Sequence, residues 1–246
     1  MIDKDDHAFS VISLLQTLQA AAPGAGGQVI VTMGNHEAEF LADPDHDEKD
    51  KDFLKELNGV KPRAITPDQV AAGTDPLKLG RFLLAMPIAA RVNDWFFCHA
   101  GNTKNLSIPA LSAALQAGID ADGYGTTVVS TSDSLLEARM HPHPWWEAPG
   151  NTPAQDRAAL AGVVKSLGVN HLVFGHQPGK FTFSDGTTRE KGRLSQKFGG
   201  LVFMIDVGMS SGIDESRGSL LRIHKKGTVG TVIDHSGKES TIWTKP

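Results

Sequence analysis

The chain has 246 residues, 40% of them hydrophobic and 21% charged, and a formal net charge of -4. This length suits one sizeable α/β domain, and the negative charge disfavours a general binder of nucleic acid or of anionic membranes. The single cysteine, Cys98, excludes an internal disulfide, and no apolar run approaches the roughly 20 residues that span a bilayer.

An amphipathic helix is predicted near the start of the chain. Its apolar residues recur at the spacing of a single helix face: Ala8, Val11, Ile12, Leu15 and Leu18. The glycine-rich run 23–27 ends it. Residues 42–58, rich in Asp, Glu and Lys, are interpreted as a solvated loop with a short helix, and residues 61–76 as an irregular connection.

Three short apolar runs each end in a histidine and a glycine. Val29-Ile30-Val31 leads into Gly34-Asn35-His36-Glu37, Trp95-Phe96-Phe97-Cys98 into His99-Ala100-Gly101, and Leu172-Val173-Phe174 into Gly175-His176-Gln177. Such runs favour buried strands, and open α/β sheets place their sites at the carboxyl ends of strands. The pattern therefore predicts three strands whose exits share one site.

The remaining elements follow from turn and cap signals. Thr152 and Pro153 are typical of a helix start, and Gly168 of the end of that helix. Further helices are expected over 77–85 and 108–117. Strands are expected over 87–92, 201–206, 218–224, 228–233 and 241–243, with a polar loop or hairpin over 180–200.

Gly-Asn-His-Glu, His-Ala-Gly and Gly-His-Gln, in this order, resemble the calcineurin-like metallophosphoesterases, in particular the phosphoprotein-phosphatase branch and its bacterial-type relatives. The resemblance extends from Met1 to about Leu221. It implies an α/β fold in which two mixed β-sheets lie between helices, as a single domain over residues 1–246. In that family a Gly-Asp-x-x-Asp-Arg motif precedes the first helix, and here only Met1 to Lys4 stand in its place. We therefore expect an amino-terminally truncated domain that lacks the first strands.

The resemblance also implies a pair of divalent metal ions, with manganese, iron or zinc as candidates. Asn35, His99 and His176 match the ligands of the second ion. These residue types suit such ions, because an amide oxygen and imidazole nitrogens are ordinary ligands of transition metals. The ligands of the first ion would precede Met1, so only half of the metal site is expected in this chain.

By the same resemblance, His36 is the general acid that protonates the leaving oxygen, and Asp3 orients it. Arg139 would hold the phosphoryl oxygens bidentately, while Lys4 would contribute a positive point charge. A surface ion pair is the alternative for Arg139. Asp206 is either a partner of a metal-bound histidine or a cap, and His141 and His143 are interpreted as rim residues.

The function implied is metal-dependent hydrolysis of phosphate monoesters, with phosphoserine or phosphothreonine in proteins as the first substrate and a dinucleoside polyphosphate or a small phosphate ester as the second. The alternative is a non-catalytic fragment or binding module that retains half of the metal site. We expect a phosphorylated protein or small molecule as partner, and neither nucleic acid nor a membrane span. Cytoplasm is the default expectation for localisation, and the sequence gives no signal for oligomeric state.

Overall fold

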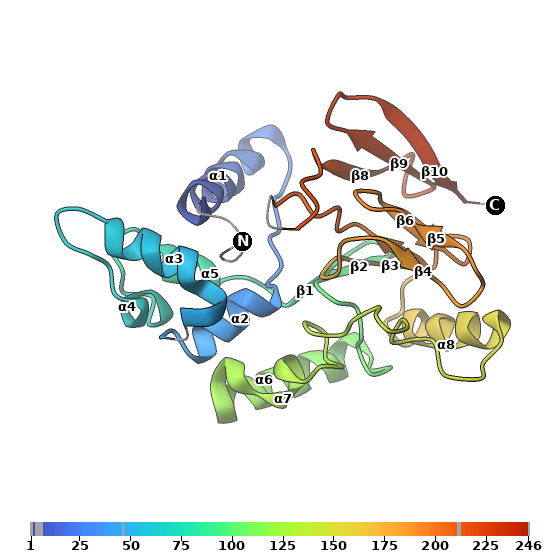
Figure 1. Cartoon of the computed structure of the whole chain (residues 1–246), viewed down its shortest axis with the longest axis horizontal. Helices are drawn as coiled ribbons and strands as arrows, with labels where there is room; N and C mark the ends of the chain where they lie inside the picture. The colour runs from blue at the N-terminus through green and yellow to red at the C-terminus, as the bar shows by residue number, and fades with distance from the viewer. Residues whose placement is uncertain (1, 3–6, 46, 211–212, 246) are drawn as a thin grey trace.

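The computed structural model describes residues 2, 7–45, 47–210 and 213–245. A mixed sheet of five strands lies between a layer of helices and a small antiparallel sheet (Figure 1). The five-stranded sheet has the order β1 (Ala89–Val92), β2 (Trp95–Cys98), β3 (His171–Phe174), β7 (Val202–Met204) and β6 (Ser195–Lys197). The α/β class and its mixed sheet are therefore confirmed.

The central strands of this sheet run parallel. β2 pairs with β3 and β3 with β7 in parallel, whereas β1 and β6 add the antiparallel edges. The β1–β2 hairpin turns at Asn93, whose φ of 54° is in the left-handed region that asparagine tolerates. Because parallel strands end at the same edge, the exits of β2, β3 and β7 bring His99, His176 and Asp206 to one side of the sheet.

Successive residues of a strand point to opposite faces of the sheet, so alternate residues pack against different elements. Phe96, Leu172 and Phe174 pack against α8 (Pro153–Ser166) and α6 (Ile108–Asp122) on one face. On the other face, Trp95 and Phe203 pack against Trp243 of the antiparallel sheet. That second sheet consists of β8 (Ser219–His224), β9 (Val229–Asp234) and β10 (Glu239–Thr244), which confirms the strands predicted over 218–224, 228–233 and 241–243.

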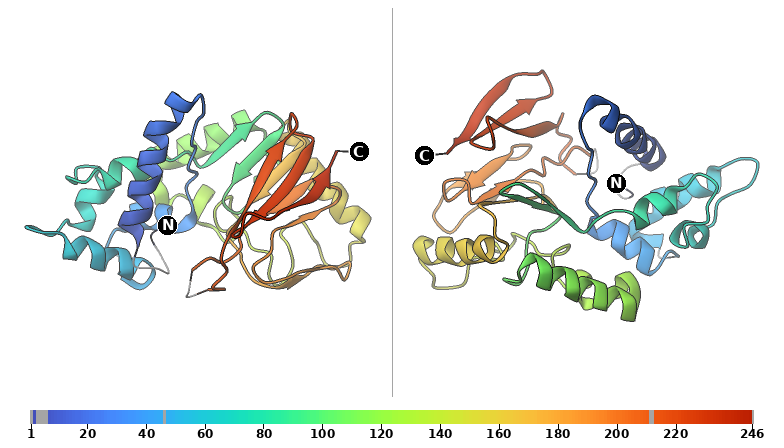
Figure 2. Two further views of the ribbon diagram at one scale, coloured as in Figure 1. Left: turned by 90° about the horizontal axis from the view of Figure 1, so that it is seen from above. Right: turned by 180° about the vertical axis from the view of Figure 1, so that it is seen from behind.

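The amino-terminal helices form a separate group beside the sheets (Figure 1, Figure 2). They are α1 (Ala8–Ala21), η1 (Ala22–Ala25), α2 (Asn35–Ala42), α3 (Asp47–Gly59), α4 (Pro67–Ala71) and α5 (Leu79–Leu84). They share a core that includes Ile12, Phe40 and Leu83. The helix predicted from Ala8, Val11, Ile12, Leu15 and Leu18 is confirmed as α1, although Val11 and Leu18 of its expected apolar face are exposed.

Two predictions in this group need correction. Residues 42–58 are not mainly a solvated loop, since α3 spans thirteen residues. The side chains of Phe53 and Leu57 on this helix are 0% and 1% exposed. These two apolar residues, four apart on one helix face, outweigh the surrounding charges. The connection 61–76 contains α4, which a Thr66–Gln69 capping box starts.

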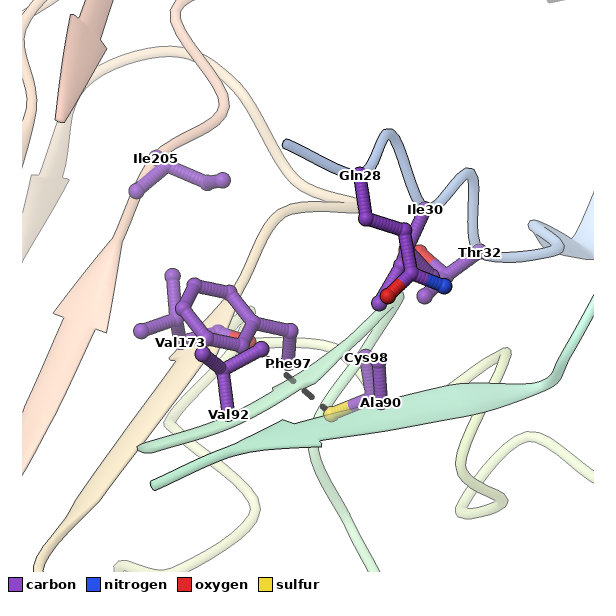
Figure 3. A pocket seen from close by; sticks show the side chains of 9 residues that line it. All are labelled: Gln28, Ile30, Thr32, Ala90, Val92, Phe97, Cys98, Val173 and Ile205. Carbon is purple, nitrogen blue, oxygen red and sulfur yellow. Dashed lines mark hydrogen bonds between the residues drawn. The ribbon is translucent and has the colours of Figure 1, made fainter. Parts of the chain in front are cut away.

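The predicted strand 29–31 does not form a strand in the structure. In the described part of the chain, none of the backbone amides of residues 28–32 donates a hydrogen bond, and Ile30 is 41% exposed. Gln28, Ile30 and Thr32 instead face a cavity of about 380 Å³ whose other wall includes Phe97, Val173 and Ile205 (Figure 3). Among the described residues, no strand pairs with this β-branched run.

The remaining segments complete the frame of the site. α6 is followed by η2 (Gly123–Gly125) and α7 (Thr127–Ser130), and the loop after β3 contains the short hairpin of β4 (Phe181–Thr182) and β5 (Thr188–Arg189). The helix capped by Thr152 is confirmed, with a reciprocal bond from Thr152 to Gln155. Among the described residues, no helix has the length and apolar character needed to cross a bilayer.

Candidate metal centre

The three predicted metal ligands come together. The Nε2 atom of His99 lies 3.0 Å from Oδ1 of Asn35 and 2.9 Å from Nδ1 of His176. Asn35 is the first residue of α2, His99 follows β2 directly, and His176 follows β3 by one residue with a φ of 66°. Two strand exits and one helix start thus bring these donor atoms together.

The spacing of these atoms fits a bound cation. Two ligands that each lie about 2.1 Å from an ion, at right angles to one another, are separated by about 3.0 Å. Both contacts at His99 have this length. An amide oxygen with two imidazole nitrogens suits manganese, iron or zinc, and this geometry does not choose among them.

The electrostatics of the site keep both imidazoles neutral. Burial lowers the pKa of His99 to about 4, while the negative charge of Glu37 opposes this shift. Burial also lowers the pKa of His176 to about 3, and the charges of His99, Arg139 and His36 add to the effect. Neutral rings are the form in which histidine binds metal, so both side chains have a free lone pair at neutral pH.

Gly34 allows the closest approach in the site. A Cβ atom at this position would lie 2.8 Å from Oε2 of Glu37 and 3.0 Å from Cε1 of His99. The same Glu37 carboxylate accepts a hydrogen bond of 3.0 Å from the Gly34 amide and so begins α2. The glycine of the Gly-Asn-His-Glu run is therefore required by the packing of His99 against the backbone.

The predicted catalytic and substrate-binding residues are placed less completely. His36 lies close enough to both ligand histidines to lower their pKa values, and its Nδ1 atom is 4.0 Å from Oε2 of Glu39. Arg139 is exposed, and its charge acts on His176. Asp3 and Lys4 lie outside the described residues.

Four further residues from the sequence can now be located. Cys98 is 6% exposed within the main core, and burial raises the pKa of its thiol, so it is not a nucleophile paired with His99. Asp206 accepts a hydrogen bond of 3.0 Å from the Gly208 amide, which makes it a turn cap. His141 and His143 are exposed, as expected of rim residues.

The profile of the calcineurin-like phosphoesterases matches residues 1–180 of the chain. The chain belongs to this family. Solved structures with similar folds include two of a cold-active protein tyrosine phosphatase. One is a mutant form of that phosphatase, with a TM-score of 0.66 and 18% identity over 95% of this chain and 64% of that one. The other, a structure at 1.1 Å, has a TM-score of 0.67 and 19% identity, covering 94% of this chain and 62% of that one.

A third similar fold is a protein serine/threonine phosphatase from Saccharomyces cerevisiae with similarity to human phosphatase PP5. Its TM-score is 0.52 at 12% identity, covering 99% of this chain and 68% of that one. At these identities the likeness concerns the fold. This calcineurin-like phosphoesterase spans less than two thirds of the cold-active phosphatase chains that it matches.

The structure also places residues near the site that the motifs did not indicate. Glu39 is the acidic neighbour of His36, and its position three residues further along a helix is the signal that could have indicated it. Gln177 accepts a hydrogen bond from the Met140 amide, and Arg189 donates one to the backbone carbonyl of Gln177, next to His176. Arg189 lies thirteen residues beyond His176 in a glycine-rich loop, and no local pattern marks it.

Proposed function

We propose that this calcineurin-like phosphoesterase is a metal-dependent phosphatase that hydrolyses phosphate monoesters through a dinuclear metal centre. The supporting observation is the convergence of Asn35 Oδ1 and His176 Nδ1 on His99 Nε2, at 3.0 and 2.9 Å. Phosphoserine or phosphothreonine in proteins is the proposed substrate, and a dinucleoside polyphosphate is the second choice.

Asn35, His99 and His176 would hold one ion of the pair. Two divalent ions, when bound, supply positive charge for the phosphoryl group and a water molecule of lowered pKa. The residues of the chain itself would bind the phosphate ester and supply the proton that the leaving oxygen takes up. Arg139 would hold two phosphoryl oxygens with its planar guanidinium, and His36 would donate a proton to the leaving oxygen.

The placement of His36 supports this role. It follows Asn35 directly at the start of α2, and its charge acts on both His99 and His176. The Oε2 atom of Glu39 lies 4.0 Å from its Nδ1 atom. Asp3, which we propose orients His36, and Lys4, which would add positive charge, belong to the part of the chain outside the described residues.

The test is manganese-dependent hydrolysis of para-nitrophenyl phosphate. His36→Asn should lower kcat by roughly 10²- to 10⁴-fold, which is the usual contribution of general acid catalysis. It should leave the affinity for manganese within about twofold, because His36 is not among the proposed ligands. His235→Asn, at an exposed histidine next to β9, is the matched control and should have no effect on either quantity.

A second candidate is a metal-binding module without turnover. It is favoured by the donor set: within the described ranges, no three His, Cys, Asp or Glu side chains are grouped so that they could hold a metal ion. A carboxylate that could complete a dinuclear centre with His99 and His176 is therefore not found there. In this case the protein would bind manganese, His176→Ala would abolish that binding, and no hydrolysis would accompany it. If the unaltered protein bound no manganese at all, both candidates would fail.

A further inference from the structure

The side chain of Gln177 joins the two loops that carry His176 and Arg139. Its Oε1 atom accepts a hydrogen bond of 2.6 Å from the Met140 amide and one of 3.3 Å from the His141 amide. Gln177 follows His176 directly, and Met140 follows Arg139 directly. A single amide oxygen therefore connects the neighbour of a proposed metal ligand to the neighbour of a proposed phosphate-binding residue.

The loop around His176 is itself held by a buried arginine. Arg189 is 2% exposed, and its Nη2 atom donates hydrogen bonds of 2.6 Å to the Gln177 carbonyl and 3.0 Å to the Gly179 carbonyl. Its Nε atom donates a third bond of 3.2 Å to Gly179. A planar fork that binds two carbonyls fixes both the position and the orientation of the peptide between them.

This restraint acts where the backbone needs one. His176 has a φ of 66°, a left-handed conformation that is strained for a residue with a Cβ atom. Gly179, with a φ of 89°, then turns the chain away from the site. Burial lowers the pKa of the Arg189 guanidinium, while the negative charges of Asp206 and Asp214 oppose this shift.

We propose that Gln177 and Arg189 are positioning residues of the phosphatase site. Arg189 fixes the loop that presents His176, and Gln177 transmits this position to the loop of Arg139. The metal-binding imidazole and the phosphate-binding guanidinium thereby keep a constant separation. The proposal rests on the proposed function, because it assigns a role in metal and phosphate binding to two residues that touch neither.

The first experiment measures the affinity of the manganese-loaded full chain for inorganic phosphate by calorimetry. Gln177→Met removes the acceptor at similar volume and should weaken phosphate binding about tenfold, with manganese affinity within about twofold of the unaltered protein. Gln196→Met is the matched control, since the Gln196 side chain likewise accepts a backbone hydrogen bond, from Gly200 at 2.9 Å. It should leave phosphate affinity unchanged.

A double-mutant cycle then separates positioning from general stability. If Gln177 acts through Arg139, Gln177→Met should have no further effect on phosphate affinity once Arg139→Met is present. Equal losses in both backgrounds would overturn the proposal. Arg189→Lys keeps the charge but loses the fork, and should weaken manganese binding about tenfold while the thermal midpoint of the metal-free protein falls only slightly. Unchanged manganese affinity in Arg189→Lys would overturn the role of Arg189.

The bridge can also be tested without metal, which separates it from the proposed function. In the metal-free protein, Gln177→Met should make the amides of Met140 and His141 exchange with solvent faster, and Gln177→Glu, which keeps an acceptor oxygen, should preserve their protection. If the unaltered protein bound no manganese, the proposed function would fail while this measurement still decided the bridge. Unchanged exchange of the two amides in Gln177→Met would refute it.

Discussion

Two segments that lead into the candidate site have similar sequences and different structures. Leu172-Val173-Phe174 forms the middle of a five-stranded sheet, paired on both sides and almost fully buried. Val29-Ile30-Val31 is equally apolar and richer in β-branched residues, but it is unpaired in the described structure and partly exposed. The comparison shows that an apolar β-branched run specifies an extended backbone, while pairing depends on which neighbours are available.

The comparison also shows two ways of holding a ligand. His176 leaves a strand whose hydrogen-bonded ladder fixes its start, and the Arg189 contacts fix the loop beyond it. Asn35 leaves a segment without a ladder, and its position depends on the start of α2 and on the packing of Gly34 against His99. The first attachment is made by backbone pairing and the second by local side-chain contacts.

Hydrogen exchange should show the largest difference between the two segments. The amides within β3 lie in paired strands, and we expect them to exchange only through large-scale unfolding, many orders of magnitude more slowly than free peptide. The amides of Val29, Ile30 and Val31 have no acceptor within the described structure and should exchange close to the rate of free peptide. Comparable protection in both segments would show that 29–31 pairs with another strand in solution.

Truncation of isomeric side chains should give the next largest difference. Leu172 is 0% exposed in the main core, so Leu172→Ala should reduce the free energy of unfolding by about 2–5 kcal/mol. Ile30 is 41% exposed, so Ile30→Ala should cost less than about 1 kcal/mol. Denaturant unfolding with equal m-values would provide both numbers. A cost above about 2 kcal/mol for Ile30→Ala would mean that its cavity is filled in solution.

These contrasts mark how far the sequence alone could predict the molecule. A continuous apolar run located β3, and cap signals located α8, because burial and helix ends leave marks within a single segment. Such patterns failed for 29–31, because pairing is a property of two segments and the pattern describes one. They also missed the α3 core residues, since a dense run of charges hides a spacing of four.

The residues of the candidate site also divide into those that the sequence predicted and those that it could not predict. The spacing of the motifs, with the family resemblance, predicted Asn35, His99 and His176 as one set of ligands. In the structure, the Nε2 atom of His99 lies 3.0 Å from Oδ1 of Asn35 and 2.9 Å from Nδ1 of His176. Gln177 and Arg189 could not be predicted, because they act through backbone carbonyls and amides. Backbone carbonyls and amides occur at every position, so a contact to them leaves no residue pattern in the sequence.

A substitution at Gly34 tests the side-chain attachment directly. The new Cβ of Gly34→Ala would lie 3.0 Å from the His99 ring and 2.8 Å from the Glu37 carboxylate, so both would have to move. We expect manganese affinity to fall at least tenfold, about 1.4 kcal/mol, with little change in the thermal midpoint. Gly24→Ala, where nothing lies within 4 Å, is the matched control. Unchanged manganese affinity in Gly34→Ala would show that the metal ligands still bind the ion after His99 and Glu37 have moved.

The loop beyond His176 offers the smallest effect, through a pair of charges. Lys197 donates to the Asp185 carboxylate and, at 2.7 Å, to the Thr187 hydroxyl. The hydrogen bond from Lys197, and then that from Thr187, lowers the pKa of Asp185 to about 2, although burial opposes the shift. The unfolded value is about 3.9, so the pair stabilises the fold above that pH, and this contribution is lost as the pH falls through about 2.

Asp185→Asn should therefore lower the stability by on the order of 1 kcal/mol at neutral pH, after screening by solvent, and the difference from the unaltered protein should shrink between about pH 4 and pH 2. Thermal unfolding measured across this range would show it. Asp133→Asn is the matched control, because the Lys104–Asp133 side chains are 48% and 63% exposed and solvent screens that pair. If both variants lost the same stability, solvent would screen the Lys197–Asp185 pair as strongly as the exposed Lys104–Asp133 pair. The β4–β5 loop would then depend on Arg189, and no longer on Lys197, for its attachment beside His176.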